Sequence, residues 1–152
     1  GGAPHYGNLG CTPESLRRIF EVCPSPNLGI CYDPSHFLRI QIDYIRLLAE
    51  FGDRVRHVHL KDTEIIEEKL YESGILGESY SNTYICGEGW WRYTIPGEGQ
   101  VDWQQVIRRL EESGYDGVLS VELEDHHFWQ TPELQQEGLV RSKEYIEQFL
   151  KG

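Results

Sequence analysis

Three short apolar runs of the sequence each deliver a side chain that can ligate a metal ion. The first run ends at Asp33, the second contains His59 near its end, and the third contains Glu122. Two carboxylates and an imidazole form a donor set suited to Mn²⁺, Mg²⁺, Zn²⁺ or Co²⁺. We therefore predict a divalent-metal site formed by Asp33, His59 and Glu122.

Each of these side chains also has a simpler interpretation when it is taken alone. Asp33 precedes Pro34 and could cap a turn, and His59 could be a core histidine with ordinary hydrogen-bond partners. Glu122 is harder to explain in this way, because a carboxylate flanked by Val and Leu in a strand is costly to bury unless it is paired or metal-bound.

Strands that alternate with helices are expected to position the three residues. Strands are predicted at residues 28–32, 55–60 and 117–123, and helices at 13–23, 37–51, 103–113 and 131–150. This order indicates an α/β fold of parallel (β/α) units, a partial TIM-type barrel with about three strands and four helices. Side chains alternate along a strand, so Asp33, His59 and Glu122 fall on one face near the strand tips, where (β/α) barrels place ligand groups.

Residues 62–100 are predicted to form a long, aromatic-rich connection with a short helix near 64–72. Connections of that length are usually functional in a compact domain. Trp90, Trp91 and Tyr93 within it either stack on a sugar ring or pack across helix ends. A pair of histidines, His126 and His127, is either a second metal site or an exposed part of a loop.

Composition narrows the classes of partner. The 152 residues fit one domain, 1–152, and 14 Lys and Arg against 25 Asp and Glu give a formal charge of −11. This balance argues against a nucleic acid or an anionic membrane surface as partner, although it permits a small anionic ligand. The four cysteines form no C-x-x-C pair, and no signal peptide or long apolar run is present, so we expect reduced, mostly buried thiols in a cytoplasmic protein.

Four stretches of the chain carry a resemblance to a known family. They read NLGICYDPSHF, HVHLKDTE, WWRYTIPGEGQVDW and GYDGVLSVELED, and they span most of residues 25–125. In order and spacing they resemble the sugar phosphate isomerase/epimerase family of xylose isomerase-like TIM barrels. The resemblance implies a divalent metal and proton transfer beside the carbonyl of a small sugar or sugar phosphate, through an enediolate.

The resemblance also implies roles for particular residues. In that family Glu, Asp, His and Glu from four strands hold the metal, and the last three correspond to Asp33, His59 and Glu122. Glu122 would also be one of two carboxylates that move the proton. The remaining implied roles are substrate contacts for His36, Lys61 and Arg92, and orientation of His59 or the substrate by Asp62.

The first Glu of the family pattern has no counterpart, since Ala3 stands near its place. We therefore interpret the chain as the C-terminal part of a barrel, which pairs with a complementary N-terminal segment or self-associates. Alone, it is expected to bind metal weakly and to turn over sugars poorly. The alternatives are a non-catalytic binding or assembly module and a related abasic-site nuclease, and the acidic charge disfavours the nuclease.

Overall fold

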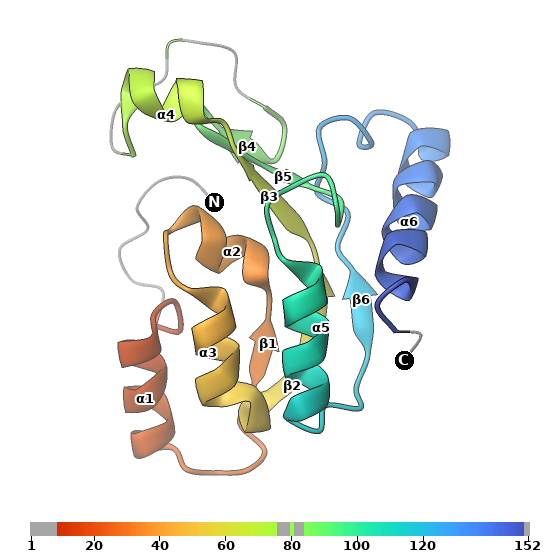
Figure 1. Cartoon of the computed structure of the whole chain (residues 1–152). Helices are drawn as coiled ribbons and strands as arrows, with labels where there is room; N and C mark the ends of the chain where they lie inside the picture. Colours follow the sequence, from red (N-terminus) through yellow and green to blue (C-terminus); the bar gives the residue numbers. More distant parts are fainter. Residues whose placement is uncertain (1–8, 76–79, 81–83, 151–152) are drawn as a thin grey trace.

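The computed structural model describes residues 9–75, 80 and 84–150, and its centre is a parallel three-stranded sheet (Figure 1). The strands are β1 (Ile30–Tyr32), β2 (Val55–Leu60) and β6 (Leu119–Val121), in the order β1-β2-β6. Both pairs are parallel, so the three carboxyl ends meet at one edge. The predicted α/β fold with three parallel strands is confirmed.

Helices pack against the apolar side of this sheet. They are α1 (Pro13–Val22), α2 (Pro34–Arg39), α3 (Tyr44–Phe51), α5 (Trp103–Glu112) and α6 (Pro132–Glu147), and a 3-10 turn (Gly52–Arg54) follows α3. In Figure 1, α1, α3 and α5 stand beside the lower part of the sheet, and α6 lies next to β6. The main core includes Ile30, Tyr32, Leu47, Leu48, Val58, Leu60, Trp103, Val106 and Ile107. Burial of these apolar surfaces is the main force that holds helices and sheet together.

Side-chain caps start the helices where the sequence predicts. Thr12 caps α1 and Thr131 caps α6, each followed by proline in the first turn. The Asp102 carboxylate caps α5 by accepting from the Gln105 backbone N–H at 3.0 Å. Each cap satisfies a backbone N–H that has no partner within its own helix.

The predicted helix 37–51 is wrong, because the chain forms two helices there. Gln41 has φ of 62°, a left-handed conformation that ends α2, and Asp43 caps α3. The break turns Ile40, which was expected in the apolar stripe, outward, where it is 44% exposed. A left-handed residue cannot continue a right-handed helix.

A second sheet lies within the segment where a long connection was expected, and it is formed by residues 62–65 and 87–94. Its strands are β3 (Asp62–Ile65), β4 (Gly87–Glu88) and β5 (Trp91–Thr94), antiparallel in the order β3-β5-β4. The short helix α4 (Glu67–Ser73) begins after β3, three residues later than predicted. The described residues thus contain six α-helices, where about four and a short helix near 64–72 were expected.

The cysteines differ from their predicted burial. Cys23 and Cys31 are exposed, Cys11 and Cys86 are half-buried, and none of the four forms a disulfide. Cys31 is exposed because it lies on the polar face of β1, opposite to the buried Ile30 and Tyr32.

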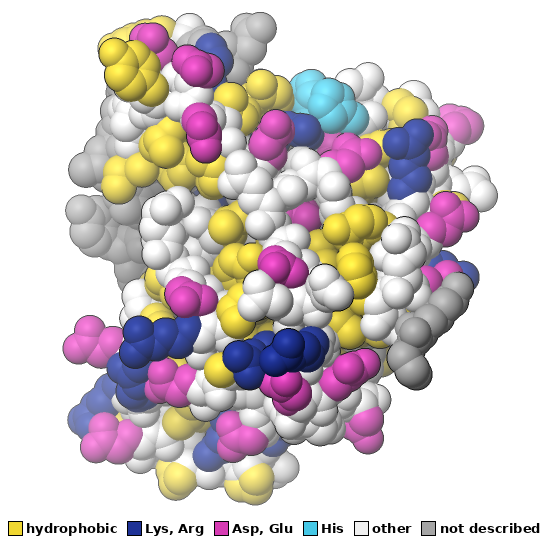
Figure 2. All heavy atoms as spheres, viewed as in Figure 1, with side chains coloured by type: hydrophobic (Ala, Val, Ile, Leu, Met, Phe, Trp, Pro, Cys, Tyr) yellow, Lys and Arg dark blue, Asp and Glu magenta, His cyan; other side chains and the backbone are white. Residues whose placement is uncertain are grey.

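Charged side chains of both signs mix on the face seen in Figure 2. Arg17 pairs with Glu50, and Arg108 with Glu112, between and within the helices of that face. None of the helices in the described ranges combines the length and apolar character that crossing a bilayer requires.

Candidate metal centre

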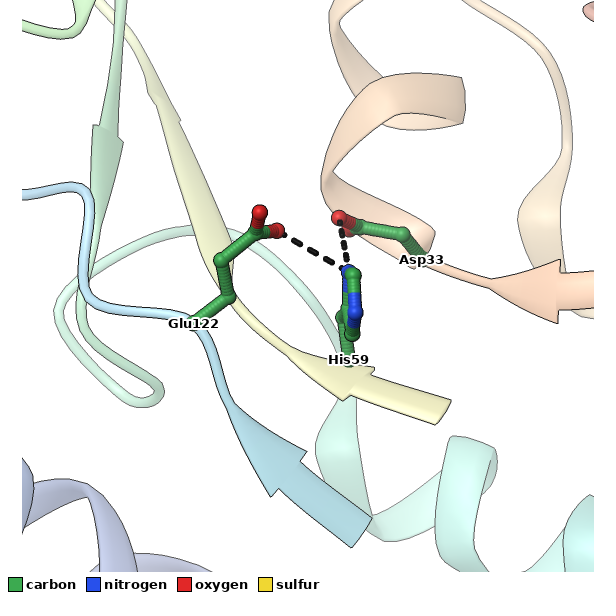
Figure 3. Close-up of side chains that lie close together, drawn as sticks. All are labelled: Asp33, His59 and Glu122. Atoms are coloured by element: carbon green, nitrogen blue, oxygen red, sulfur yellow. Dashed lines mark ion pairs between the residues drawn. The ribbon is translucent and has the colours of Figure 1, made fainter. Parts of the chain in front are cut away.

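Three neighbouring strand ends bring Asp33, His59 and Glu122 together (Figure 3). Asp33 follows β1 directly, His59 is the fifth residue of β2, and Glu122 follows β6. The parallel register sets His59 beside Ser120, two residues before Glu122. All three side chains point into the same space at the carboxyl edge of the sheet.

The distances between the donor atoms are compact. His59 Nδ1 lies 3.0 Å from Glu122 Oε2 and 3.7 Å from Asp33 Oδ2. One ligand atom from each residue lies within 4.8 Å of the others. Ligands about 2.0–2.2 Å from one metal ion are separated from each other by distances in this range.

The two carboxylate oxygens of Asp33 have different surroundings. Oδ1 caps α2, accepting from the Ser35 backbone N–H at 3.0 Å and from the Ser35 hydroxyl at 2.5 Å. Oδ2 is buried and makes no hydrogen bond, although the Lys61 ammonium lies 3.2 Å away. The turn-capping interpretation of Asp33 is therefore correct for one oxygen, and the other oxygen remains available as a ligand.

The arrangement fits a divalent cation. A buried carboxylate oxygen without a hydrogen bond costs free energy, which a cation bound beside it would recover. In the part of the chain that the structure describes, Asp33, His59 and Glu122 are the one group of three or more such side chains spaced to hold an ion. The second nitrogen of His59, Nε2, lies 3.6 Å from Cys31 Sγ, so Nδ1 is the nitrogen that faces the two carboxylates.

Lys61 lies inside this cluster, with only 1% of its side chain exposed. Its Nζ donates to Glu122 Oε2 at 2.5 Å and to Glu124 Oε2 at 2.9 Å. Burial acts to lower the pKa of Lys61, but the Asp33 charge and the hydrogen bonds to the two glutamates outweigh it and raise the pKa above its ordinary value. The side chain is therefore a buried ammonium ion.

His36 stands at the rim of the cluster and is held by Tyr93. The Tyr93 hydroxyl and His36 Nδ1 are 2.6 Å apart, and His36 Nε2 is 3.4 Å from Asp33 Oδ2. Burial lowers the pKa of His36, while the Asp33 charge acts in the opposite direction. Desolvation raises the pKa of Tyr93 far above its ordinary value, so the phenol stays protonated and can donate to the imidazole.

Arg92 lies on β5 and is engaged by two carboxylates. Its Nε donates to Glu64 Oε2 at 2.6 Å, across the β3–β5 pair, and its Nη1 is 3.5 Å from Asp125 Oδ1. The buried Nη1 itself makes no hydrogen bond. Arg92 thus connects β3 of its own sheet with the loop after β6.

The Asp62 carboxylate makes its hydrogen bonds away from the candidate metal site. Its carboxylate accepts four hydrogen bonds, from the Thr63, Gly97 and Val101 backbone and from the Trp103 indole. Burial raises the pKa of Asp62, and these donors act against that shift. The contacts fix the 97–103 segment at the start of α5. The role expected for Asp62 was to orient His59 or the substrate, and none of these hydrogen bonds goes to His59.

The aromatic residues on either side of Arg92 pack into a small core of their own. Trp90, Trp91 and Tyr93 are all buried, and the Arg39 guanidinium stacks over the Trp91 ring at 4.7 Å. These side chains therefore pack, as one of the two interpretations expected, but against Ile65 of β3 and Leu70 of α4 rather than across helix ends. Of the two histidines after β6, His126 accepts from the Ile85 backbone N–H through Nδ1.

Two contacts beside the cluster were not predicted from the sequence. Glu124 contacts Lys61, and Tyr93 contacts His36. The alternation of the third strand places Glu124 on the same face as Glu122, which is a signal that could have identified it. No such signal exists in the sequence for the contact between Tyr93 and His36, because that contact depends on the second sheet, which was not predicted.

Comparison with known proteins places this geometry in a family. The model of the xylose isomerase-like TIM barrel matches residues 3–145. An inosose dehydratase of Clostridium perfringens is 27% identical over 144 residues, 95% of this chain and 46% of that protein. The chain therefore spans about half the length of the curated relatives it matches.

Solved structures agree with the sequence comparison. A xylose isomerase domain protein from Planctomyces limnophilus has a TM-score of 0.68 at 27% identity, over 91% of this chain and 43% of that one. A structure described as IOLI protein with a binding zinc atom has a TM-score of 0.59 at 21% identity, over 93% of this chain and 46% of that one, and shows the likeness of fold. The chain belongs to the xylose isomerase-like TIM barrel family.

Proposed function

We propose that this chain is the C-terminal part of a divalent-metal-dependent enzyme that modifies a small sugar or related polyol. One observation carries the proposal: two carboxylates and an imidazole converge at the carboxyl ends of three adjacent parallel strands. In (β/α) barrels that edge is where active sites lie. Asp33, His59 and Glu122 are the proposed ligands, within a single domain of residues 1–152.

When bound, the metal would polarise a substrate carbonyl and stabilise negative charge that develops on its oxygen. Glu122 is the proposed proton acceptor at the neighbouring carbon, because its carboxylate is 37% exposed and faces the same space. His36, also partly exposed, and Lys61 lie beside it and are the proposed contacts for substrate oxygens. Arg92 is proposed to contact substrate from the second sheet.

Proton removal beside a carbonyl leads to two outcomes. Return of the proton gives isomerisation or epimerisation, and loss of a hydroxyl from the next carbon gives dehydration. The relatives named inosose dehydratase favour dehydration of a polyol ketone. Removal of the proton is the first step of both outcomes. It is therefore the step to test.

The test combines metal binding with proton exchange. Calorimetric titration of the 152-residue chain with Mn²⁺ or Zn²⁺ should show one site, which Glu122→Gln weakens at least about tenfold because a charged ligand is lost. Glu112→Gln, which changes an exposed glutamate on α5, is the matched control and should leave the affinity unchanged.

Exchange of the carbon-bound hydrogen of inosose into D₂O, followed by NMR, then reports the proton transfer. We expect metal-dependent exchange that is slow, because Ala3 stands near the place of a further glutamate ligand of the family pattern. Glu122→Gln should abolish this exchange, because it removes the proposed proton acceptor. Metal-independent exchange, or full exchange in Glu122→Gln, would refute the assigned chemistry. A chain that binds no metal would instead be a binding or assembly module.

A further inference from the structure

The buried Lys61 ammonium shares its oxygen partners with the proposed metal. Asp33 Oδ2 and Glu122 Oε2 are the oxygens nearest to His59 Nδ1, and both also lie within 3.2 Å of Lys61 Nζ. Any cation held by those atoms would therefore lie close to a second positive charge. Like charges at such short separation repel strongly in a partly buried site.

The charges of the cluster balance in a particular way. Lys61 contacts three carboxylates, those of Asp33, Glu122 and Glu124. One ammonium against three carboxylates leaves two negative charges, which one divalent cation would neutralise. Without the ammonium, three carboxylates would converge with no positive partner, an arrangement that is costly when one of them is as buried as Asp33.

We propose that Lys61 is a positioning residue that acts as the resident counter-ion of the metal centre. Its ammonium holds the carboxylates of Asp33 and Glu122 in place before metal binds, and it weakens metal binding by competing for the same oxygens. The site thereby gains stability in the metal-free state at the expense of affinity for the ion. This inference rests on the proposed metal site.

The Tyr93 ring helps to keep the ammonium in position. Its centroid lies 4.5 Å from Lys61 Nζ, within the range of a cation–π contact. Lys61 thus has carboxylates and an aromatic face around it, which leaves it little freedom to move away when a metal ion enters. The repulsion should therefore persist in the metal-loaded state and appear in the measured affinity.

The test measures metal affinity and thermal stability of the 152-residue chain in parallel. Lys61→Met keeps an unbranched side chain but removes the charge, so it should bind Mn²⁺ about tenfold tighter or more while its metal-free melting temperature falls. Lys61→Arg keeps the charge and should remain within about threefold of the wild-type affinity. Lys143→Met removes an exposed lysine of α6 and is the matched control.

Glu124→Gln supplies the converse test, because it removes one negative charge without touching a proposed ligand. It should weaken Mn²⁺ binding about threefold or more, since less negative charge then opposes Lys61. This variant keeps the inference testable if Lys61→Met does not fold, as judged by circular dichroism.

The outcomes separate this inference from the function on which it rests. If wild type binds Mn²⁺ and a folded Lys61→Met binds it equally or more weakly, Lys61 is a structural residue and the inference is wrong. If Glu124→Gln binds more tightly than wild type, the inference is equally wrong. If no variant binds Mn²⁺ or Zn²⁺, Lys61→Met included, the metal site itself is refuted and the inference falls with it.

Discussion

The two oxygens of Asp33 predict that stability and metal binding can be separated by mutation. Oδ1 caps α2 through Ser35, whereas Oδ2 faces the cluster. Asp33→Asn can keep its amide oxygen at the cap, but it places an uncharged amide nitrogen toward His59. Asp33→Ala removes both functions at once.

The magnitudes follow from the contacts that each variant loses. Loss of a helix cap costs about 1 kcal/mol, and loss of the hydroxyl hydrogen bond from Ser35 about another 1 kcal/mol. The free energy of unfolding of Asp33→Ala should therefore fall by about 2 kcal/mol. For a chain of this size that corresponds to a fall of about 4–8 °C in melting temperature. Asp33→Asn should lose about 1 kcal/mol less than Asp33→Ala, because both cap donors keep an acceptor, whereas both variants lose the charge beside Lys61 Nζ.

Thermal denaturation and calorimetric metal titration of the same samples test this separation. Both Asp33 variants should lose at least about tenfold in Mn²⁺ affinity, since a charged ligand is gone. Asp43→Ala is the matched control: it removes an exposed cap, that of α3, so stability should fall by about 1 kcal/mol with metal affinity unchanged. Equal destabilisation by Asn and Ala at position 33, or normal Mn²⁺ affinity in Asp33→Asn, would refute the division of roles.

Three further substitutions probe the framework around the cluster. Gln41→Gly should raise the free energy of unfolding by about 0.5–1 kcal/mol in urea denaturation, because glycine adopts φ of 62° without strain; a loss would show that the side chain contributes more than the strain costs. Asp62→Ala should lower it by about 3–5 kcal/mol, since four buried donors lose their acceptor, and a loss below about 1 kcal/mol would contradict the role assigned to this carboxylate. Tyr93→Phe should change the ¹⁵N chemical shift of His36 Nδ1, while Tyr115→Phe, which loses a hydroxyl contact elsewhere, should not; an unchanged shift in Tyr93→Phe would mean that the hydrogen bond does not form in solution.

The residues of the proposed metal site were predictable because they depend on local patterns. Strand alternation alone places Asp33, His59 and Glu122 on one face, and the βα order makes the strands parallel, so their ends meet. The caps at Thr12 and Asp102 were predictable for the same reason, since a cap depends on residues within one turn of the chain.

The second sheet was not predictable in this way. Its strands are two to four residues long, and residues 66–86 separate β3 from its partners. Their pairing depends on side chains that meet only after folding, such as Glu64 opposite Arg92. The break at Gln41 was not predicted, because apolar residues keep a helical spacing across residues 37–51. The backbone nevertheless leaves the helical conformation at Gln41, where φ is 62°.

The junction between the two sheets explains why the surroundings of the site escaped prediction while its centre did not. Lys61 is the single residue between β2 and β3, and its neighbour Asp62 points the opposite way. Lys61 reaches the carboxylates of the cluster, and Asp62 anchors the start of α5. The second sheet therefore begins beside the proposed metal site, and its strand β5 returns there through Tyr93, which contacts His36. Alternation within one strand can locate the ligands, but only the path of the chain through both sheets shows that a buried cation lies beside them.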